Sequence, residues 1–156
     1  MGRPYVDELA ELPDTYKRAL ETPIDGLTGF VNASLRAPLR VVGSGGSATA
    51  CVFASVLHEQ ATYMVSRHAT PLEQLDAKSS PGTSVLLVSA GGNNKDIIAA
   101  FERASSLDRN ALGVLCSSGG RGKLFRMCAS HPSVYVQDAD IRNKDGFLAT
   151  NSLLAA

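Results

Sequence analysis

Residues 41–50 read VVGSGGSATA, so a short apolar segment runs directly into a loop of glycine and serine. Within it, residues 43–48 fit the pattern G-x-G-x-x-A, which dinucleotide-binding loops and simpler phosphate-binding loops share. Glycine lets the backbone come close to a ligand, and the free N–H groups at the start of a helix attract an anion. The stretch therefore predicts a strand, an anion-binding loop and a helix, and it leaves the kind of anion open.

The rest of the chain alternates between two kinds of segment. The strand-like segments are LRVVG (39–43), TYMVSR (62–67), SVLLVSA (84–90), ALGVLCS (111–117) and SVYVQ (133–137). Helical patterns occupy residues 47–61, 94–106 and 123–129, and a last one begins at residue 146. Such alternation with short connections indicates βαβ units and a parallel sheet. We expect a three-layer αβα sandwich with a five-stranded parallel sheet in flavodoxin-like order.

A helical segment precedes the first strand. Apolar residues recur there at three- and four-residue steps, the period of one helix face, at Ile24, Leu27, Val31 and Leu35. Pro23 interrupts this pattern, so two helical pieces are expected. We expect a single domain, with a helical segment at 1–37 and an α/β core at 38–156. The chain stops inside an apolar helical pattern, which suggests the N-terminal part of a longer protein or a helix that packs on a partner.

Composition excludes several classes of protein. Fifteen basic and fifteen acidic side chains cancel, so nothing predicts a nucleic-acid partner. No apolar run reaches the roughly 18–20 residues of a membrane span, and no signal peptide is visible. Cys51, Cys116 and Cys128 lack C-x-x-C spacing, which favours reduced core thiols over disulfides or zinc. We expect a cytoplasmic protein with no metal, no cofactor and no membrane partner.

A second loop has the same chemistry as the first. Residues 89–96, SAGGNNKD, again join a buried strand to a helix and offer a serine hydroxyl, two glycines and two asparagine amides. In a flavodoxin-like order the first and third strands are neighbours, and ligands bind outside the carboxyl ends of strands where the order reverses. We therefore expect residues 43–47 and 89–94 to hold one phosphate between them.

A dinucleotide site predicts a different feature, an acidic residue about 20 positions after the first loop to hold the ribose. Arg67 and His68 stand there instead. Because an arginine at this place can accept the 2′-phosphate of NADP, an NADP-binding domain remains an alternative. A third loop, SSGGRGK (117–123), departs from the P-loop pattern because Leu124 follows its lysine.

Together these motifs resemble those of the sugar isomerase (SIS) domain family. That family has a glycine-rich first loop ending in serine, a second motif S-x-S-G-x-[ST]-x-[ED], and a third serine-containing loop followed by a short helix. The corresponding stretches here are GSGGS, SAGGNNKD and GVLCSSGGRGKLFRMC. In the second motif Ser89, Gly92 and Asp96 match, Gly91 replaces the usual second serine, and Asn94 replaces the usual serine or threonine.

The resemblance implies a phosphosugar-binding domain that forms a homodimer or pairs with a second SIS domain. It places the phosphate cradle at Ser44, Gly45, Ser47, Ser89, Gly92 and Asn93. Asn94 matches in part because its amide can donate a hydrogen bond, and at Gly91 a backbone N–H can replace the missing side chain. Ser117 or Ser118 is expected to contact a sugar hydroxyl.

Isomerisation of a sugar needs a base beside the substrate and stabilisation of an enediolate. Glu73 resembles the loop glutamate after the second strand in arabinose-phosphate isomerase-like SIS proteins. His58 lies on a helical stripe that faces the sheet, where a core or dimer-interface role is the alternative to a catalytic one. Two functions stay open: an enzyme, either an aldose/ketose sugar-phosphate isomerase or an amino-sugar-phosphate deaminase, and a non-catalytic phosphosugar-sensing module.

Overall fold

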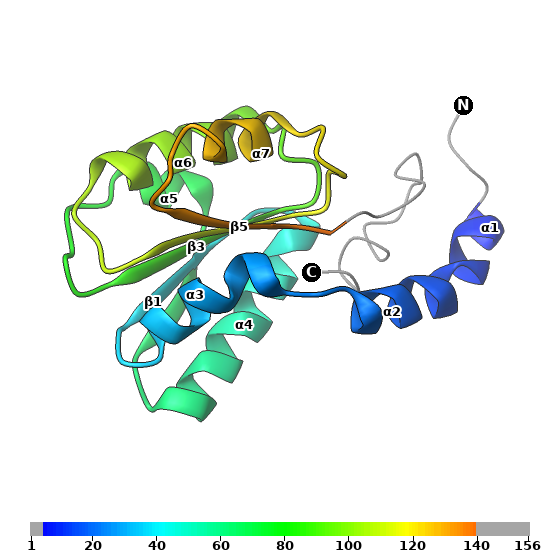
Figure 1. Ribbon diagram of the computed structural model, residues 1–156, viewed down its shortest axis with the longest axis horizontal. Coiled ribbons are helices and arrows are strands. Elements are labelled where there is room, and N and C mark those ends of the chain that lie inside the picture. Colours follow the sequence, from blue (N-terminus) through cyan, green and yellow to red (C-terminus); the bar gives the residue numbers. More distant parts are fainter. Residues whose placement is uncertain (1–4, 140–156) are drawn as a thin grey trace.

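The computed structural model describes residues 5–139, so the helix expected from residue 146 lies outside the described residues. The sheet consists of β1 (Leu39–Val42), β2 (Ser66–Ala69), β3 (Ser84–Ser89), β4 (Leu112–Cys116) and β5 (Val134–Asp138) (Figure 1). All strand pairs are parallel, and the order across the sheet is β2-β1-β3-β4-β5. The expected flavodoxin-like order is confirmed.

Helices cover both faces of the sheet and complete the three layers (Figure 1). One face carries α3 (Asp25–Ser34) and α4 (Gly46–Thr62), and the other carries α5 (Pro71–Leu75), α6 (Lys95–Ser106) and α7 (Lys123–Cys128). Successive strand residues point to opposite faces, so each strand contributes to two cores. Val41 packs in the core with Phe30 of α3, and Val42 packs in the core with Phe101 of α6.

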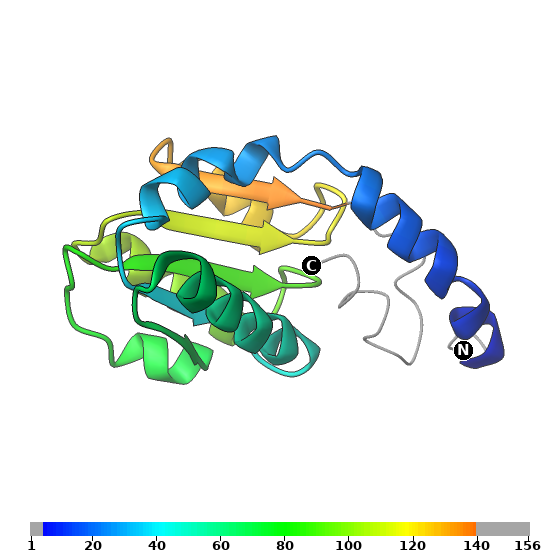
Figure 2. The same cartoon turned by 90° about the horizontal axis from the view of Figure 1, so that it is seen from below.

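Two further helices, α1 (Tyr5–Ala10) and α2 (Leu12–Glu21), extend away from the sheet, as the views in Figures 1 and 2 both show. The N-terminal segment thus forms three helices rather than the expected two. Pro13 explains the extra break, because proline is favoured in the first turn of a helix and α2 begins there, after Glu11. The break before Pro23 is confirmed, since Thr22 is extended with ψ 122°.

The second strand lies later in the chain than the expected residues 62–67. Helix α4 continues to Thr62, and Tyr63 ends it in the left-handed conformation with φ 58°. The β-branched and aromatic residues that suggested a strand are the end of α4 and an exposed connection to β2. Their side-chain types favour a strand, but the packing of α4 on the sheet overrides that preference.

Other expectations from composition can be compared with the described part of the chain. The three cysteines are buried thiols, as expected. Within residues 5–139 no helix combines the length and the apolar character that crossing a membrane requires. Over the same residues, histidine, cysteine and carboxylate side chains do not gather in groups of three or more that could hold a metal.

Helix α3 can approach β5 closely because two of its residues are glycines. A Cβ on Gly26 would fall well inside van der Waals contact with the Val136 carbonyl oxygen. A Cβ on Gly29 would collide in the same way with the ring of Tyr135. An aromatic ring can rotate away from a new Cβ, whereas a backbone oxygen cannot. Glycine is therefore required more strictly at position 26 than at position 29.

We predict that Gly26→Ala destabilises the protein by about 1–3 kcal/mol through overpacking. Alanine favours helices over glycine by about 1 kcal/mol, so propensity alone predicts the opposite sign. Urea unfolding measures the difference. The control is Gly82→Ala, because a Cβ there meets nothing within 4 Å. Equal unfolding midpoints for the two variants would contradict the close α3–β5 contact.

Candidate anion-binding site

The loop between β1 and α4 requires glycine at two positions. A Cβ on Gly43 would lie 2.6 Å from the sulfur of Cys51 and 3.1 Å from the carbonyl oxygen of Val88. Only glycine therefore lets the chain leave β1 so close to both α4 and β3. Gly45, the N-cap of α4, has φ 57°, in the left-handed region that favours glycine.

This first loop presents hydrogen-bond donors that the protein itself does not use. Among residues 5–139, neither the hydroxyls of Ser44 and Ser47 nor the backbone amides from Ser44 to Ser47 find a hydrogen-bond partner. Ser44 is exposed and Ser47 is half-buried. They stand at the N-terminus of the 17-residue helix α4, where the helix dipole places positive potential. This end of α4 is therefore suited to an anion.

The second loop follows β3 and is shaped by its own serine. The Ser89 hydroxyl accepts a hydrogen bond from the backbone N–H of Gly92 at 3.1 Å, which leaves its own hydrogen to donate. Gly92 has φ 63° and again needs glycine. At Gly91, by contrast, a Cβ would meet nothing within 4 Å, so the serine usual in the SIS motif has room there.

Both asparagines of the second loop keep an NH₂ group available. Oδ1 of Asn94 accepts from the Asp96 backbone N–H at 2.7 Å and so caps α6. Oδ1 of Asn93 accepts from the Lys123 backbone N–H at 2.9 Å. Each side-chain oxygen therefore holds the loop in place, and each Nδ2 remains to donate.

The two loops leave the sheet side by side. β1 pairs with β3, with Val42 opposite Leu87, and the strand order reverses at this pair. The position of a Cβ on Gly43, 3.1 Å from the Val88 oxygen, shows how close the first loop is to the end of β3. The expected proximity of the two strand ends that lead into these loops is confirmed.

The third loop, residues 117–122, packs against the second. The Ser117 backbone N–H donates to the Ala90 carbonyl oxygen at 3.1 Å, and the Leu124 N–H donates to that of Gly92 at 2.8 Å. A Cβ on Gly122 would lie 2.8 Å from the Gly91 oxygen, so glycine permits this approach. Ser117 is brought to the site but is only 2% exposed, beneath the loop surface.

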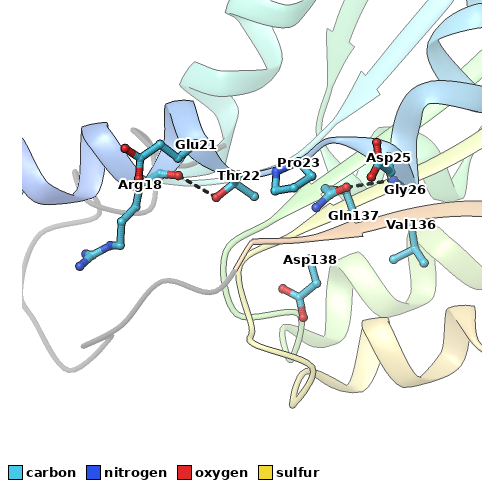
Figure 3. Close-up of a pocket in the computed structure, with 9 residues that line it drawn as sticks. All are labelled: Arg18, Glu21, Thr22, Pro23, Asp25, Gly26, Val136, Gln137 and Asp138. Atoms are coloured by element: carbon cyan, nitrogen blue, oxygen red, sulfur yellow. Dashed lines mark hydrogen bonds between the residues drawn. The ribbon is translucent and has the colours of Figure 1, made fainter.

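A cavity of about 700 Å³ opens at the carboxyl end of β5, the same edge of the sheet as the three loops. Its walls come from the junction of α2 with α3 and from the last residues of β5 (Figure 3). The Gly26 N–H donates to Oε1 of Gln137 at 3.1 Å, which joins α3 to β5 at this cavity. Figure 3 shows the carboxyl group of Asp138 directed away from Pro23 on the opposite wall.

Glu73 is not in a loop but in the short helix α5. Its carboxylate accepts from the Thr70 backbone N–H at 2.6 Å, and the Thr70 hydroxyl accepts from the Glu73 N–H at 3.2 Å. This is a capping box, and T-P-L-E was its signal in the sequence. The hydrogen bonds from Thr70, the backbone one first, lower the pKa of Glu73, which makes the carboxylate a weaker base.

We predict that Glu73→Gln lowers stability at pH 7 and that its difference from the natural chain shrinks at pH 3. A lowered pKa in the folded state stabilises above the unfolded value of about 4.3, and that stabilisation is lost as the pH falls through the folded value. Thermal unfolding at both pH values measures it. Glu102→Gln, at an exposed position on α6, is the control. A difference that is the same at both pH values would contradict the capping role.

His58 is not brought to the candidate site. Its Nε2 donates to the Ser34 carbonyl oxygen at 3.1 Å, which ties α4 to the end of α3. Because α4 runs back across the sheet, His58 lies about 18 Å along the helix from Gly46. The structure gives it a contact between helices near the amino edge of the sheet, away from both loops.

Two residues of this edge were not expected from the sequence. Gly122 belongs to the incomplete P-loop pattern, which predicts no contact for it, although glycine in a loop is a signal of close backbone approach. Asp138 lies one residue beyond the last strand that the sequence predicts, which ends at residue 137. A carboxylate that ends a strand beside a Gly-Gly loop is the signal that identifies it.

No family model matches the chain, and no curated protein sequence matches it. Solved structures do share its fold. Tagatose-6-phosphate ketose/aldose isomerase from Escherichia coli has a TM-score of 0.75 at 16% identity, over 96% of this chain and 44% of that one. Phosphoheptose isomerase from Neisseria gonorrhoeae has a TM-score of 0.65 at 14% identity, over 96% and 90%. The sugar isomerase domain of an RpiR transcription factor from Sphaerobacter thermophilus has 0.58 at 20%, over 97% and 84%.

Fold and site together define a three-layer α/β domain with two donor-rich loops at the point where the strand order reverses. The likeness to these structures confirms the resemblance noted in the sequence: the chain has the fold of the sugar isomerase domain. It spans less than half the length of the E. coli isomerase and most of the length of the other two chains.

Proposed function

We propose that this chain binds a phosphorylated sugar and holds its phosphate between residues 43–47 and 89–94. The observation that carries the proposal is the pairing of β1 with β3, which puts two sets of unused donors side by side. The hydroxyls of Ser44, Ser47 and Ser89 and the amides of Asn93 and Asn94 are the proposed ligands. Backbone N–H groups at Gly45 and Gly91 are further proposed donors, and Gly92, whose N–H donates to the Ser89 hydroxyl, shapes the cradle.

The names of proteins with this fold support a sugar phosphate as the ligand, because two of them are sugar-phosphate isomerases. NADP is the competing ligand, and the exposed Arg67 of β2 is the residue that would take its 2′-phosphate. Thermal-shift measurements separate the two, since a ligand stabilises the form that binds it. Stabilisation by a sugar phosphate and none by NADP supports our proposal.

Catalysis by this chain has less support from the described residues than phosphosugar binding has. The carboxylate of Glu73 is engaged in a capping box that lowers its pKa and so weakens it as a base, and His58 lies away from the loops. This favours a phosphosugar-sensing module, the kind of role suggested by the transcription factor that shares the fold. An isomerase or deaminase would complete its site with residues outside 5–139 or from another subunit. Turnover assays with hexose, pentose and amino-sugar phosphates distinguish these two functions.

We predict that Ser47→Ala combined with Ser89→Ala weakens sugar-phosphate binding strongly. Each lost hydrogen bond to a charged group costs about 1.5–3 kcal/mol, which corresponds to roughly 10- to 150-fold in affinity. Isothermal titration with hexose, pentose and amino-sugar phosphates measures the loss.

Ser133→Ala is the matched control, because Ser133 is exposed at the opposite edge of the sheet, just before β5. A second variant, Gly91→Ser, adds a hydroxyl where space exists and is expected to tighten binding. Unchanged affinity in the double variant would place the ligand elsewhere on the molecule.

We also propose that the chain pairs with a second copy of itself or with another domain of this fold. Helix α4 exposes four large apolar side chains on one side, at Val52, Phe53, Val56 and Leu57. Leu9 in α1 and Leu20 in α2 are exposed as well, on helices that extend from the domain (Figure 2). Exposed apolar side chains that gather on one surface commonly mark an interaction site.

We expect Phe53→Glu to convert a dimer into a monomer, because a charge would be buried in the interface. Size-exclusion chromatography with light scattering measures the mass. Leu72→Glu is the matched control, since Leu72 is as exposed as Phe53 (62% against 64%) but lies in α5 on the other face. A natural chain that is monomeric at high concentration would remove the self-pairing proposal.

A further inference from the structure

The third loop closes around a carboxylate that belongs to the chain itself. Oδ1 of Asp138 accepts from the backbone N–H of Ser118 at 2.6 Å and from that of Gly119 at 3.2 Å. Oδ2 accepts from the Ser118 hydroxyl at 2.7 Å and from the N–H of Gly120. Three successive amides and a hydroxyl thus converge on one anionic group.

The conformation of this loop is that of an anion-binding nest. Gly119 and Gly120 have φ values of 59° and 77°, in the left-handed region. Successive N–H groups in such turns point into one concavity, the arrangement that many proteins use for phosphate. Ser118 is only 7% exposed, so its hydroxyl is directed to Asp138 rather than to solvent. The nest is therefore built for an anion, and Asp138 fills it.

Hydrogen bonds connect this nest to the second loop of the proposed phosphate cradle. Asp138 ends β5 opposite Cys116, and the N–H of Ala139 donates to the Cys116 oxygen at 2.8 Å, which fixes where the carboxylate stands. From the other end of the third loop, the N–H of Lys123 donates to Oδ1 of Asn93. The N–H of Leu124 donates to the oxygen of Gly92. Asp138 therefore fixes the third loop, and the third loop in turn fixes the second loop.

We propose that Asp138 is a resident anion that closes the third loop and thereby positions residues 89–94. It acts through the loop and is a positioning residue. With its nest occupied, the third loop offers no anion site of its own, and the pair of loops after β1 and β3 remains as the place for a ligand phosphate. The effect on ligand rests on the proposed function, whereas the effect on the loops does not.

Removal of this side chain leaves the three amides and the Ser118 hydroxyl facing a space of carboxylate size. We expect Asp138→Ala to lower the thermal unfolding temperature by several degrees, since hydrogen bonds to a charged group are lost. Acetate, added in millimolar steps, is expected to restore most of that loss in a saturable way. Sodium chloride at equal ionic strength controls for screening.

Two further variants separate the effect of losing the Asp138 charge from the effect of leaving its space empty. Asp138→Asn keeps the size but points an NH₂ group at N–H donors, so we expect it to be destabilised and not restored by acetate. Asp76→Asn, at an exposed position that ends α5, controls for loss of a negative charge and is expected to resemble the natural chain. If Asp138→Ala does not fold without acetate, folding in its presence supports the proposal, and Asp138→Asn and Ser118→Ala carry the remaining measurements.

Amide hydrogen exchange reads the positioning role directly. In Asp138→Asn we expect faster exchange at Lys123 and Leu124, whose N–H groups bind the second loop, and no change at the amides of β1. In Asp138→Ala, sugar-phosphate affinity is expected to fall about ten-fold and to recover with acetate.

The outcomes for the two proposals differ. A natural chain that binds no sugar phosphate contradicts the proposed function, while the acetate and exchange measurements still test Asp138. Unchanged exchange at Lys123 and Leu124, together with no acetate effect beyond that on the natural chain, would overturn the role of Asp138. Recovery of stability without recovery of affinity would also overturn it, since Asp138 would then stabilise the fold without positioning the cradle.

Discussion

The parallel pairing of β1 with β3 joins two strands that are far apart in the sequence and places their carboxyl ends next to each other. Parallel strands cannot be joined by a tight turn, so each must feed a helix that crosses back over the sheet. Two helix N-termini, those of α4 and α6, therefore stand side by side at one edge. Each brings the positive end of a helix dipole to this edge, α4 with free N–H groups and α6 with an N-terminus that Asn94 caps. The chemistry of the site follows from this arrangement of the backbone before any side chain is considered.

Glycine makes the arrangement physically possible. Gly43 lets β1 end against Cys51 and the Val88 oxygen, and Gly122 lets the third loop approach the Gly91 oxygen. At this distance the second and third loops form hydrogen bonds with each other. The side-chain oxygens of Asn93 and Asn94 accept hydrogen bonds from backbone amides, which holds the loops in place. Their NH₂ groups remain available for a ligand. An anion-binding edge needs both properties, because a flexible loop would lose part of the binding energy in becoming ordered.

In the third loop the convergent backbone amides are paired by a side chain of the protein itself. Three convergent amides without an anion would be costly to leave unpaired, and Asp138 provides that anion from within the chain. One edge of the sheet thus carries an internally filled nest next to loops whose donors the described residues leave unused. A cavity of about 700 Å³ at the same edge of the sheet is lined by residues of α2, α3 and β5 and of the link between the two helices.

The amino-acid sequence was sufficient to predict the sandwich, the strand order and the two loops, because these depend on local patterns: apolar runs of strand length, glycine-serine turns and helical periodicity. The predicted position of β2 was wrong, since residues 62–65 have strand-like side chains but form the end of α4, its cap and the connection to β2. The sequence also left Glu73 and His58 as candidate bases, because their partners Thr70 and Ser34 determine whether a carboxylate or an imidazole is available. Asp138 meets the 118–120 loop only after β4 and β5 pair. Such long-range contacts depend on how the strands assemble, and no local pattern encodes them.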